Sequence, residues 1–303
     1  MNQAKLPSWR PGTTRDAIEI FLDDAETLPV ERRVAVFDID GTLWCEKPQY
    51  TMVEFLLAEL RAAVAGEPSL ATRPEYRAAL DWDRPAIARL GAVNVVLALI
   101  EQHAGITPEV FEARVRAFFS DARHPLRGVP LSQMRYRPML ELIAELRARD
   151  FDVYLVTGSG LEFTRAVSAD YFGVKPEGVV GSQVGYEFVR GNGSPTLLRT
   201  KEIFGDPNEG AAKITNIQRL LGRRPILAAG NSAGDTEMLD YTQAYVGPSL
   251  ALLVDHDDAE REYEYASIAG TFETSEPITE TAGRQGWTVV SMKRDWDMVF
   301  ADR

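Results

Sequence analysis

Cysteine is almost absent from this chain of 303 residues, because Cys45 is its only one. No intrachain disulfide can therefore form. No apolar run approaches the 18 residues that a membrane-spanning helix requires. The first residues, MNQAKLPSWRPGTTRD, contain no apolar stretch of signal-peptide length. From these absences we expect a cytoplasmic protein that does not insert into a membrane.

Positive charge is also scarce. The chain has 33 Lys and Arg against 45 Asp and Glu, a formal net charge of -12. No run of Lys or Arg could form a basic face, so we expect no general binding to nucleic acid or to anionic membranes. If an acidic protein of this kind binds an anion, it must build local positive potential from a metal ion, a lysine or helix N-termini.

Three apolar segments of strand length each end in polar residues and glycine: residues 33–38, 151–157 and 224–230. Such runs are typical of parallel strands buried on both faces. Helices are predicted over residues 13–28, 138–149, 161–172 and 210–221, and residues 245–246 and 287–292 could add strands. The alternation predicts a doubly wound, Rossmann-like α/β core whose ligand site lies at the carboxyl ends of the strands.

Residues 49–129 have a different texture. They predict helices over 51–64, 74–81, 84–103 and 108–120, with hardly any strand-like run. We therefore expect a helical cap domain at 49–129, inserted into a core formed by residues 1–48 and 130–303. A small β-hairpin is predicted over about 179–203, around the turn Gly191-Asn192-Gly193.

The first polar cluster is Asp38-Ile-Asp40-Gly41. A carboxylate can attack phosphorus and form an acyl phosphate. A second carboxylate two residues later can protonate the leaving oxygen and then take a proton from water. The alternative is a solvated turn in which Asp and Gly serve backbone geometry alone.

The other clusters complete an inventory for phosphoryl transfer. The hydroxyls and N–H groups of Thr157-Gly158-Ser159, in a loop that leads into a helix, can hold phosphoryl oxygens, although helix capping alone would also explain them. Lys213, in the first turn of a predicted helix, could neutralise an anion or be a solvated surface lysine. Asn231 and Asp235 offer oxygen ligands of the type that Mg²⁺ prefers, or form a capped turn.

In these motifs and their order, the sequence resembles the haloacid dehalogenase superfamily, particularly its phosphoserine-phosphatase-like branch. The resemblance covers about residues 33–48 and 130–255, and that branch carries its helical cap in the slot of residues 49–129. It implies that Asp38 is the nucleophile, Asp40 the general acid/base and Lys213 the neutralising cation. Thr157 and the Gly158 backbone would bind the phosphoryl group.

The resemblance also implies a Mg²⁺ site formed by Asp38, the Asp40 backbone carbonyl and the Asn231/Asp235 motif. The family's dehalogenases lack a carboxylate two residues after the nucleophile, so Asp40 indicates a phosphatase. Asn231 departs from the family, which usually has Gly-Asp where this chain has Gly230-Asn231. An asparagine carbonyl can bind Mg²⁺ but adds no charge.

We expect the substrate to be a small phosphorylated metabolite. Three residues in the segment that follows the nucleophile could contact it. Trp44, Glu46 and Tyr50 could hold an amine or a quaternary ammonium group, as in phosphoserine, phosphoethanolamine or phosphocholine. The alternative is that the aromatic rings pack the joint between core and cap. Cys45 could lie near the site or be a buried hydrophobe, and His256 could point into the cavity or belong to a solvated acidic loop.

Two other functions stay open on the sequence. One is a phosphotransferase or mutase, in which a second hydroxyl replaces water. The other is a catalytically silent phosphate-binding regulatory protein, which the asparagine at position 231 motivates.

Overall fold

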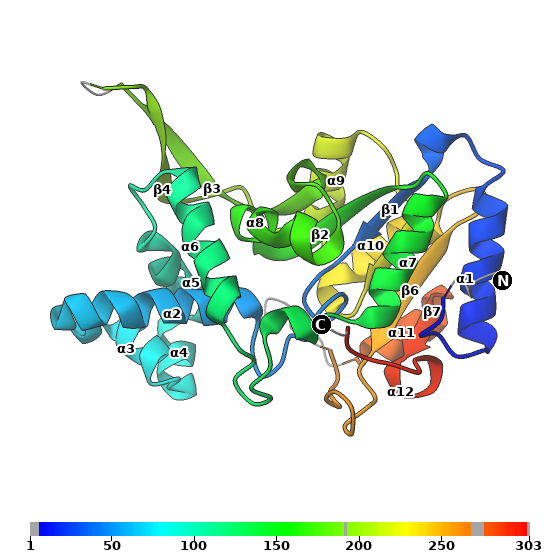
Figure 1. Ribbon diagram of the computed structural model, residues 1–303, viewed down its shortest axis with the longest axis horizontal. Coiled ribbons are helices and arrows are strands. Elements are labelled where there is room, and N and C mark those ends of the chain that lie inside the picture. Colours follow the sequence, from blue (N-terminus) through cyan, green and yellow to red (C-terminus); the bar gives the residue numbers. More distant parts are fainter. Residues whose placement is uncertain (1–5, 191–192, 268–275, 302–303) are drawn as a thin grey trace.

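The computed structural model describes residues 6–190, 193–267 and 276–301. Within them, seven strands form one sheet in the order β4-β3-β2-β1-β5-β6-β7 (Figure 1). Only β4 is antiparallel to its neighbour among these strands. The bounds are β1 (Val34–Phe37), β2 (Asp152–Gly160), β3 (Val179–Val189), β4 (Thr196–Phe204), β5 (Leu227–Gly230), β6 (Leu250–Asp255) and β7 (Thr288–Ser291).

Helices cover both faces of the sheet, which confirms the doubly wound α/β prediction. Their bounds are α1 (Thr13–Ala25), α7 (Arg137–Ala148), α8 (Leu161–Phe172), α9 (Ala211–Leu221), α10 (Thr236–Gln243), α11 (Ile278–Gln285) and α12 (Met292–Asp295). Successive side chains of β1 point to opposite faces. Val34 and Val36 pack in the cluster that contains α9, α10 and α11 residues, whereas Ala35 and Phe37 pack in the cluster that contains α1, α7 and α8 residues.

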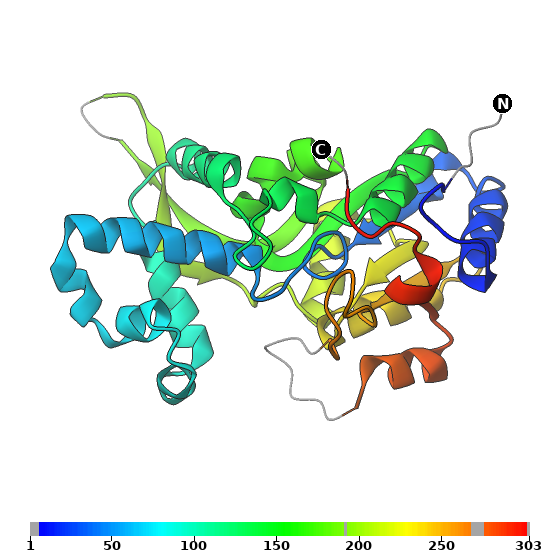
Figure 2. The ribbon, with the colours of Figure 1, turned by 60° about the horizontal axis from the view of Figure 1, so that its bottom comes forward.

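The segment after β1 forms a group of helices at one end of the molecule (Figures 1 and 2). These are α2 (Thr51–Gly66), α3 (Pro74–Leu80), α4 (Arg84–Leu90), α5 (Ala92–Glu101) and α6 (Pro108–Asp121). Their buried residues belong to the same cluster as α1, α7 and α8, so the apolar core continues from the sheet into this end. No helix of the described residues is long and apolar enough to cross a membrane.

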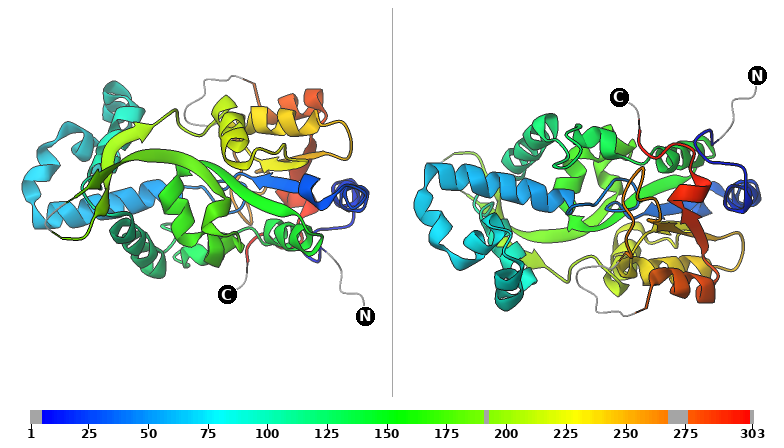
Figure 3. Two further views of the ribbon diagram at one scale, coloured as in Figure 1. Left: turned by 90° about the horizontal axis from the view of Figure 1, so that it is seen from above. Right: turned by 90° about the horizontal axis from the view of Figure 1, so that it is seen from below.

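The long strands β3 and β4 connect the sheet with these helices (Figure 3). Their bounds agree closely with the predicted hairpin, although Gly191 and Asn192 of the predicted turn lie outside the described residues. The contact with the inserted helices includes backbone hydrogen bonds, from Gly105 N to the Arg199 carbonyl and from Arg199 N to the Ile106 carbonyl, at 2.8 and 2.9 Å.

Three sequence predictions of local structure are wrong. The helix predicted at 84–103 is two helices, α4 and α5, because Gly91 between them takes a positive φ of 85°. Residues 245–246 form no strand, and the sixth strand of the chain is the apolar run Leu250–Asp255. The Thr157-Gly158-Ser159 segment is the irregular end of β2 and not a loop, since its register with β3 shifts after Val156.

Candidate active site

A cavity of about 170 Å³ lies where β1, β2 and β5 end and the inserted helices meet the core. The predicted residues Asp38, Asp40, Glu46, Lys213 and the pair Gly158–Ser159 line it. The remaining lining comes from α2 and α5, from the segments before α2 and α9, and from the turn after β5: Tyr50, Met52, Val53, Val96, Glu209, Ser232 and Gly234. The parallel strands therefore bring three sequence-distant polar clusters to one place, as their placement predicts.

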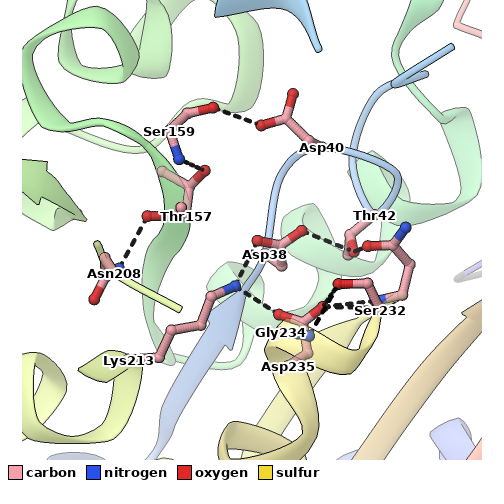
Figure 4. Close-up of polar contacts among 12 residues, drawn as sticks. Asp38, Asp40, Thr42, Thr157, Ser159, Asn208, Lys213, Ser232, Gly234 and Asp235 are labelled. Atoms are coloured by element: carbon pink, nitrogen blue, oxygen red, sulfur yellow. Dashed lines mark hydrogen bonds and ion pairs between the residues drawn. The ribbon is translucent and has the colours of Figure 1, made fainter. Parts of the chain in front are cut away.

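Lys213 joins two carboxylates at the bottom of this site (Figure 4). Its Nζ donates to Asp38 Oδ1 and to Asp235 Oδ1, both at 2.6 Å. The helix that carries it is placed by Gly210, whose N–H donates to the Gly234 carbonyl at 2.9 Å. The Lys213 side chain is only 3% exposed. A buried cation in the first turn of a helix needs such partners, and the solvated-lysine alternative does not hold.

Burial and neighbouring charges determine the protonation of Asp38 and Lys213. Burial and the neighbouring Asp235 raise the pKa of Asp38 well above its ordinary value, although Lys213 acts in the opposite direction. Burial alone would lower the pKa of Lys213, but Asp235 and Asp38 outweigh it and raise that pKa. Lys213 is therefore charged at neutral pH. One ammonium group faces the buried carboxyls of Asp38, Asp40 and Asp235, so the site favours an additional cation.

Asp40 is held by two donors from different elements. Trp44 Nε1 donates to Asp40 Oδ1 at 2.8 Å. Ser159 Oγ donates to Asp40 Oδ2, also at 2.8 Å (Figure 4). Burial raises the pKa of Asp40 to about 6, although these two hydrogen bonds lower it. A carboxyl group with a pKa near neutrality can both give and accept a proton, which is the property that general acid/base catalysis needs.

The Thr157 segment is organised by local hydrogen bonds. Thr157 Oγ1 accepts from Ser159 N at 3.0 Å, and the Thr157 carbonyl accepts from Asn208 Nδ2 at 3.0 Å. Gly158 lies against the Glu209 side chain, since a Cβ added at Gly158 would be 2.7 Å from Glu209 Oε1. A larger residue at 158 would have to displace the Glu209 side chain, which also lines the cavity.

The turn after β5 supplies the remaining oxygen atoms. Asp235 Oδ2 accepts from Asn231 N and Ser232 N at 3.0 and 3.1 Å, while its Oδ1 accepts from Lys213. Both Asp235 oxygens are thus engaged, and this residue shapes the turn and holds the lysine. Thr42 Oγ1 donates to Asp38 Oδ2 at 3.4 Å and to Asn231 Oδ1 at 3.3 Å, which places these two acceptors beside one another.

These atoms fit a hard divalent cation in donor type and in charge. Within the described residues, no group of three or more His, Cys, Asp or Glu side chains is arranged to hold a metal ion. The oxygen atoms that could hold such an ion are the Asp38 carboxylate and the Asn231 carbonyl, with the backbone of the Asp38–Asp40 turn. Oxygen ligands and surplus negative charge suit Mg²⁺, which also keeps several of its waters.

Two of the predicted substrate contacts differ in their placement. Glu46 is buried, 5% exposed, and lines the cavity together with Tyr50. Trp44 does not line the cavity and is only 3% exposed. Its ring packs against the rings of Phe119 and Phe172, with centroid distances of 5.9 and 5.4 Å. Trp44 therefore packs between the inserted helix α6 and helix α8 and donates to Asp40, which differs from a direct contact with substrate.

Sequence reasoning missed several residues of the site. Glu209 lines the cavity four residues before Lys213, and burial raises the pKa of its carboxyl. Its position just before the lysine-bearing helix was the available signal.

His256 neither points into the cavity nor lies in a solvated loop: it is 2% exposed and packs behind the Asp38–Trp44 segment. Cys45 is a buried thiol that does not line the cavity.

Several solved structures are similar to this chain. A protein of unknown function from Bordetella pertussis Tohama I has 19% identity and a TM-score of 0.54, covering 86% of this chain and 98% of its own. A conserved protein of unknown function from Anaerococcus prevotii DSM 20548 has 14% identity and a TM-score of 0.57, covering 95% and 94%. A probable phosphoserine phosphatase from Vibrio cholerae has 12% identity and a TM-score of 0.45, covering 88% and 63%.

The two structures with TM-scores above 0.5 show a shared fold. The comparison with curated proteins gave no match. A family model described as haloacid dehalogenase-like hydrolase matches residues 35–240, which contain Asp38, Asp40, Thr157, Lys213 and Asn231. Because this match covers more than half of the sequence, the chain belongs to the haloacid dehalogenase-like hydrolase family.

Proposed function

We propose that this protein is a Mg²⁺-dependent phosphatase that hydrolyses a small phosphomonoester through an aspartyl phosphate on Asp38. The observation that carries the proposal is that one cavity contains two carboxyl groups, Asp38 and Asp40, with different hydrogen-bond partners. Asp38 is held by Lys213 at 2.6 Å, while Asp40 is held by Trp44 and Ser159 with a pKa of about 6. One is oriented for attack and the other for proton transfer.

In the first step an Asp38 oxygen attacks phosphorus and the bond to the leaving oxygen breaks. Asp40 donates its proton to that oxygen, so the alcohol leaves neutral. In the second step Asp40 takes a proton from water, whose oxygen attacks the phosphorus and releases Asp38 and inorganic phosphate. Lys213 and the Thr157–Ser159 segment neutralise and orient the phosphoryl oxygens. Bound Mg²⁺, held by Asp38, Asn231 and the Asp40 backbone carbonyl, would supply further positive charge for the phosphoryl group.

The cavity walls favour a substrate with a cationic group. Glu46 and Glu209 contribute carboxyls, Tyr50 contributes an aromatic ring, and Met52 and Val53 supply an apolar side. Lys47 Nζ lies 3.4 Å from Glu46 Oε1 and is partly exposed, so this pair is one that a substrate ammonium group would compete with. The two acids oppose a bare phosphate and attract an ammonium group on the leaving alcohol. Phosphoserine, phosphoethanolamine and phosphocholine combine such a group with a phosphomonoester in a small molecule.

The test is steady-state release of phosphate from p-nitrophenyl phosphate with Mg²⁺, followed by a screen of amine-bearing and amine-free phosphomonoesters. We expect turnover that Asp38→Asn abolishes, and beryllofluoride binding only when Asp38 is intact. Glu46→Gln should raise KM for the amine-bearing esters while leaving p-nitrophenyl phosphate unaffected. Strict dependence on an acceptor hydroxyl would instead identify a phosphotransferase, and binding without any turnover would identify a silent phosphate-binding protein.

A further inference from the structure

A buried histidine lies directly behind the Asp38–Trp44 segment. His256, in the segment that follows β6, has its Nε2 2.9 Å from the carbonyl oxygen of Gly41 and its Nδ1 3.2 Å from Glu262 Oε2. The side chains of His256 and Glu262 are both 0% exposed. The segment that carries them lies beside the loop that follows β1 (Figure 2). Neither residue lines the cavity.

The partners of His256 define what its two nitrogens do. A backbone carbonyl can only accept a hydrogen bond, so Nε2 donates to Gly41, while Nδ1 faces the Glu262 carboxylate. Glu262 is prepared to accept: burial raises its pKa, but hydrogen bonding and the charge of His256 outweigh burial and hold that pKa below its usual value. Tyr136 OH donates to Glu262 Oε1 at 3.0 Å, and the Tyr265 ring stacks on His256 with centroids 4.3 Å apart.

His256 contacts Gly41, which lies in the turn directly after Asp38 and Asp40. Gly41 has a φ of 76°, and a Cβ there would be 2.0 Å from Asn231 Nδ2. Its N–H donates to the Trp44 carbonyl at 2.9 Å, and its carbonyl accepts from His256. Both peptide groups of Gly41 are therefore held. The peptide on its N-terminal side contains the Asp40 carbonyl, so its orientation decides where that oxygen points.

We propose that His256 is a positioning residue for the reaction proposed above: by holding the Gly41 carbonyl, it fixes the direction of the Asp40 carbonyl and carboxylate. It touches neither the cavity nor the reacting groups and acts only through the turn. Losing this contact would leave a buried carbonyl without its donor and release a glycine that has the widest backbone freedom of any residue.

Two substitutions separate the contacts of His256. In His256→Gln the side-chain amide reaches the place of Nε2 and can still donate to Gly41. In His256→Asn the shorter amide reaches only the place of Nδ1, so it keeps the contact with Glu262 and loses the one with Gly41. His124→Gln is the matched control, because His124 is also buried and contacts a backbone carbonyl, that of Lys47 at 2.7 Å.

The readouts are Mg²⁺ affinity by titration calorimetry, kcat and KM for p-nitrophenyl phosphate, and thermal stability. We expect His256→Asn to lose about 10- to 100-fold in Mg²⁺ affinity and in kcat, the usual effect of removing a residue behind a metal site. KM should change little, because the phosphate-facing residues are untouched. His256→Gln and His124→Gln should stay close to the wild type in all three constants.

Equal losses of Mg²⁺ affinity and kcat in His256→Asn and His256→Gln would overturn the proposal, since the Gly41 contact would then not be the cause. Wild-type values in folded His256→Asn would overturn it as well. This inference rests on the proposed function, but the two fail differently. A wild-type protein that releases no phosphate contradicts the phosphatase, whereas the positioning role is still decided by comparing Mg²⁺ affinities among the variants.

Discussion

The protonation of Asp40 predicts a measurable conflict between stability and activity. Asp40 is 8% exposed, and the pKa of its carboxyl is raised to about 6 from an ordinary value of 3.8, chiefly by burial. Ionising it is therefore less favourable in the folded protein than in the unfolded chain. The substitution Asp40→Asn removes this cost and keeps a similar shape. Its amide oxygen can accept from Trp44 Nε1, and its amide nitrogen can donate to Ser159 Oγ.

The folded and unfolded pKa values of Asp40 determine how the effect of Asp40→Asn on the free energy of unfolding changes with pH. Between pH 3.8 and 6 the folded protein holds the Asp40 proton and the unfolded chain releases it. The stabilisation from protonated Asp40 is fully present below pH 3.8 and is lost as the pH rises through 6. The difference of about 2.2 pKa units corresponds to about 3 kcal/mol, of which about 2 kcal/mol falls between pH 4.5 and 7.5. Between pH 4.5 and 7.5, the free energy of unfolding of the variant should therefore rise by about 2 kcal/mol relative to that of the wild type.

Urea unfolding of both proteins at pH 4.5 and 7.5, in EDTA so that no divalent ion perturbs the carboxyl, measures the change directly. The difference between wild type and variant cancels the titration of the groups that do not interact with Asp40. The same variant should lose about 10²- to 10⁴-fold in kcat, because both half-reactions lose their proton donor and acceptor. A stability difference that is the same at both pH values within about 0.5 kcal/mol would refute the reasoning about Asp40.

Three further variants test the site. Lys213→Met leaves buried carboxylates without their cation and should destabilise the protein by about 3–5 kcal/mol in urea unfolding at pH 7.5; a stability equal to that of the wild type contradicts the ion-pair argument. Asn231→Asp adds a negative charge beside the expected cation and should tighten Mg²⁺ binding about tenfold by calorimetry, whereas unchanged or weaker binding would place the ion elsewhere. Gly41→Ala combines a positive φ with a 2.0 Å clash, so thermal unfolding should show a larger loss than Gly128→Ala, where φ is 68° but nothing lies within 4 Å of the added Cβ. Equal losses would mean that backbone strain alone matters.

Much of the fold could be predicted from the sequence because its signals are local. Continuous apolar runs such as Val34–Phe37 mark strands that are buried on both faces, and their polar ends mark the ligand edge of a parallel sheet. The helix bounds at Thr51, Pro108 and Leu161 were predicted to the residue, since these helices begin at abrupt changes in pattern. The positions of Asp38, Lys213 and Asn231 relative to these elements were enough to predict one shared site.

The sequence by itself determined most of the strands and helices of the core, the inserted helical segment and the chemical types of the polar clusters. These features depend on apolar periodicity and strand ends, which are patterns among neighbouring residues. Only the tertiary structure decided which partner each polar group meets. Trp44 turned from a candidate substrate contact into a donor to Asp40, and His256 from a loop residue into a support of Gly41, 215 positions away in the chain. Burial and hydrogen bonding depend on groups that are distant in sequence, and those distances close only when the sheet and helices pack.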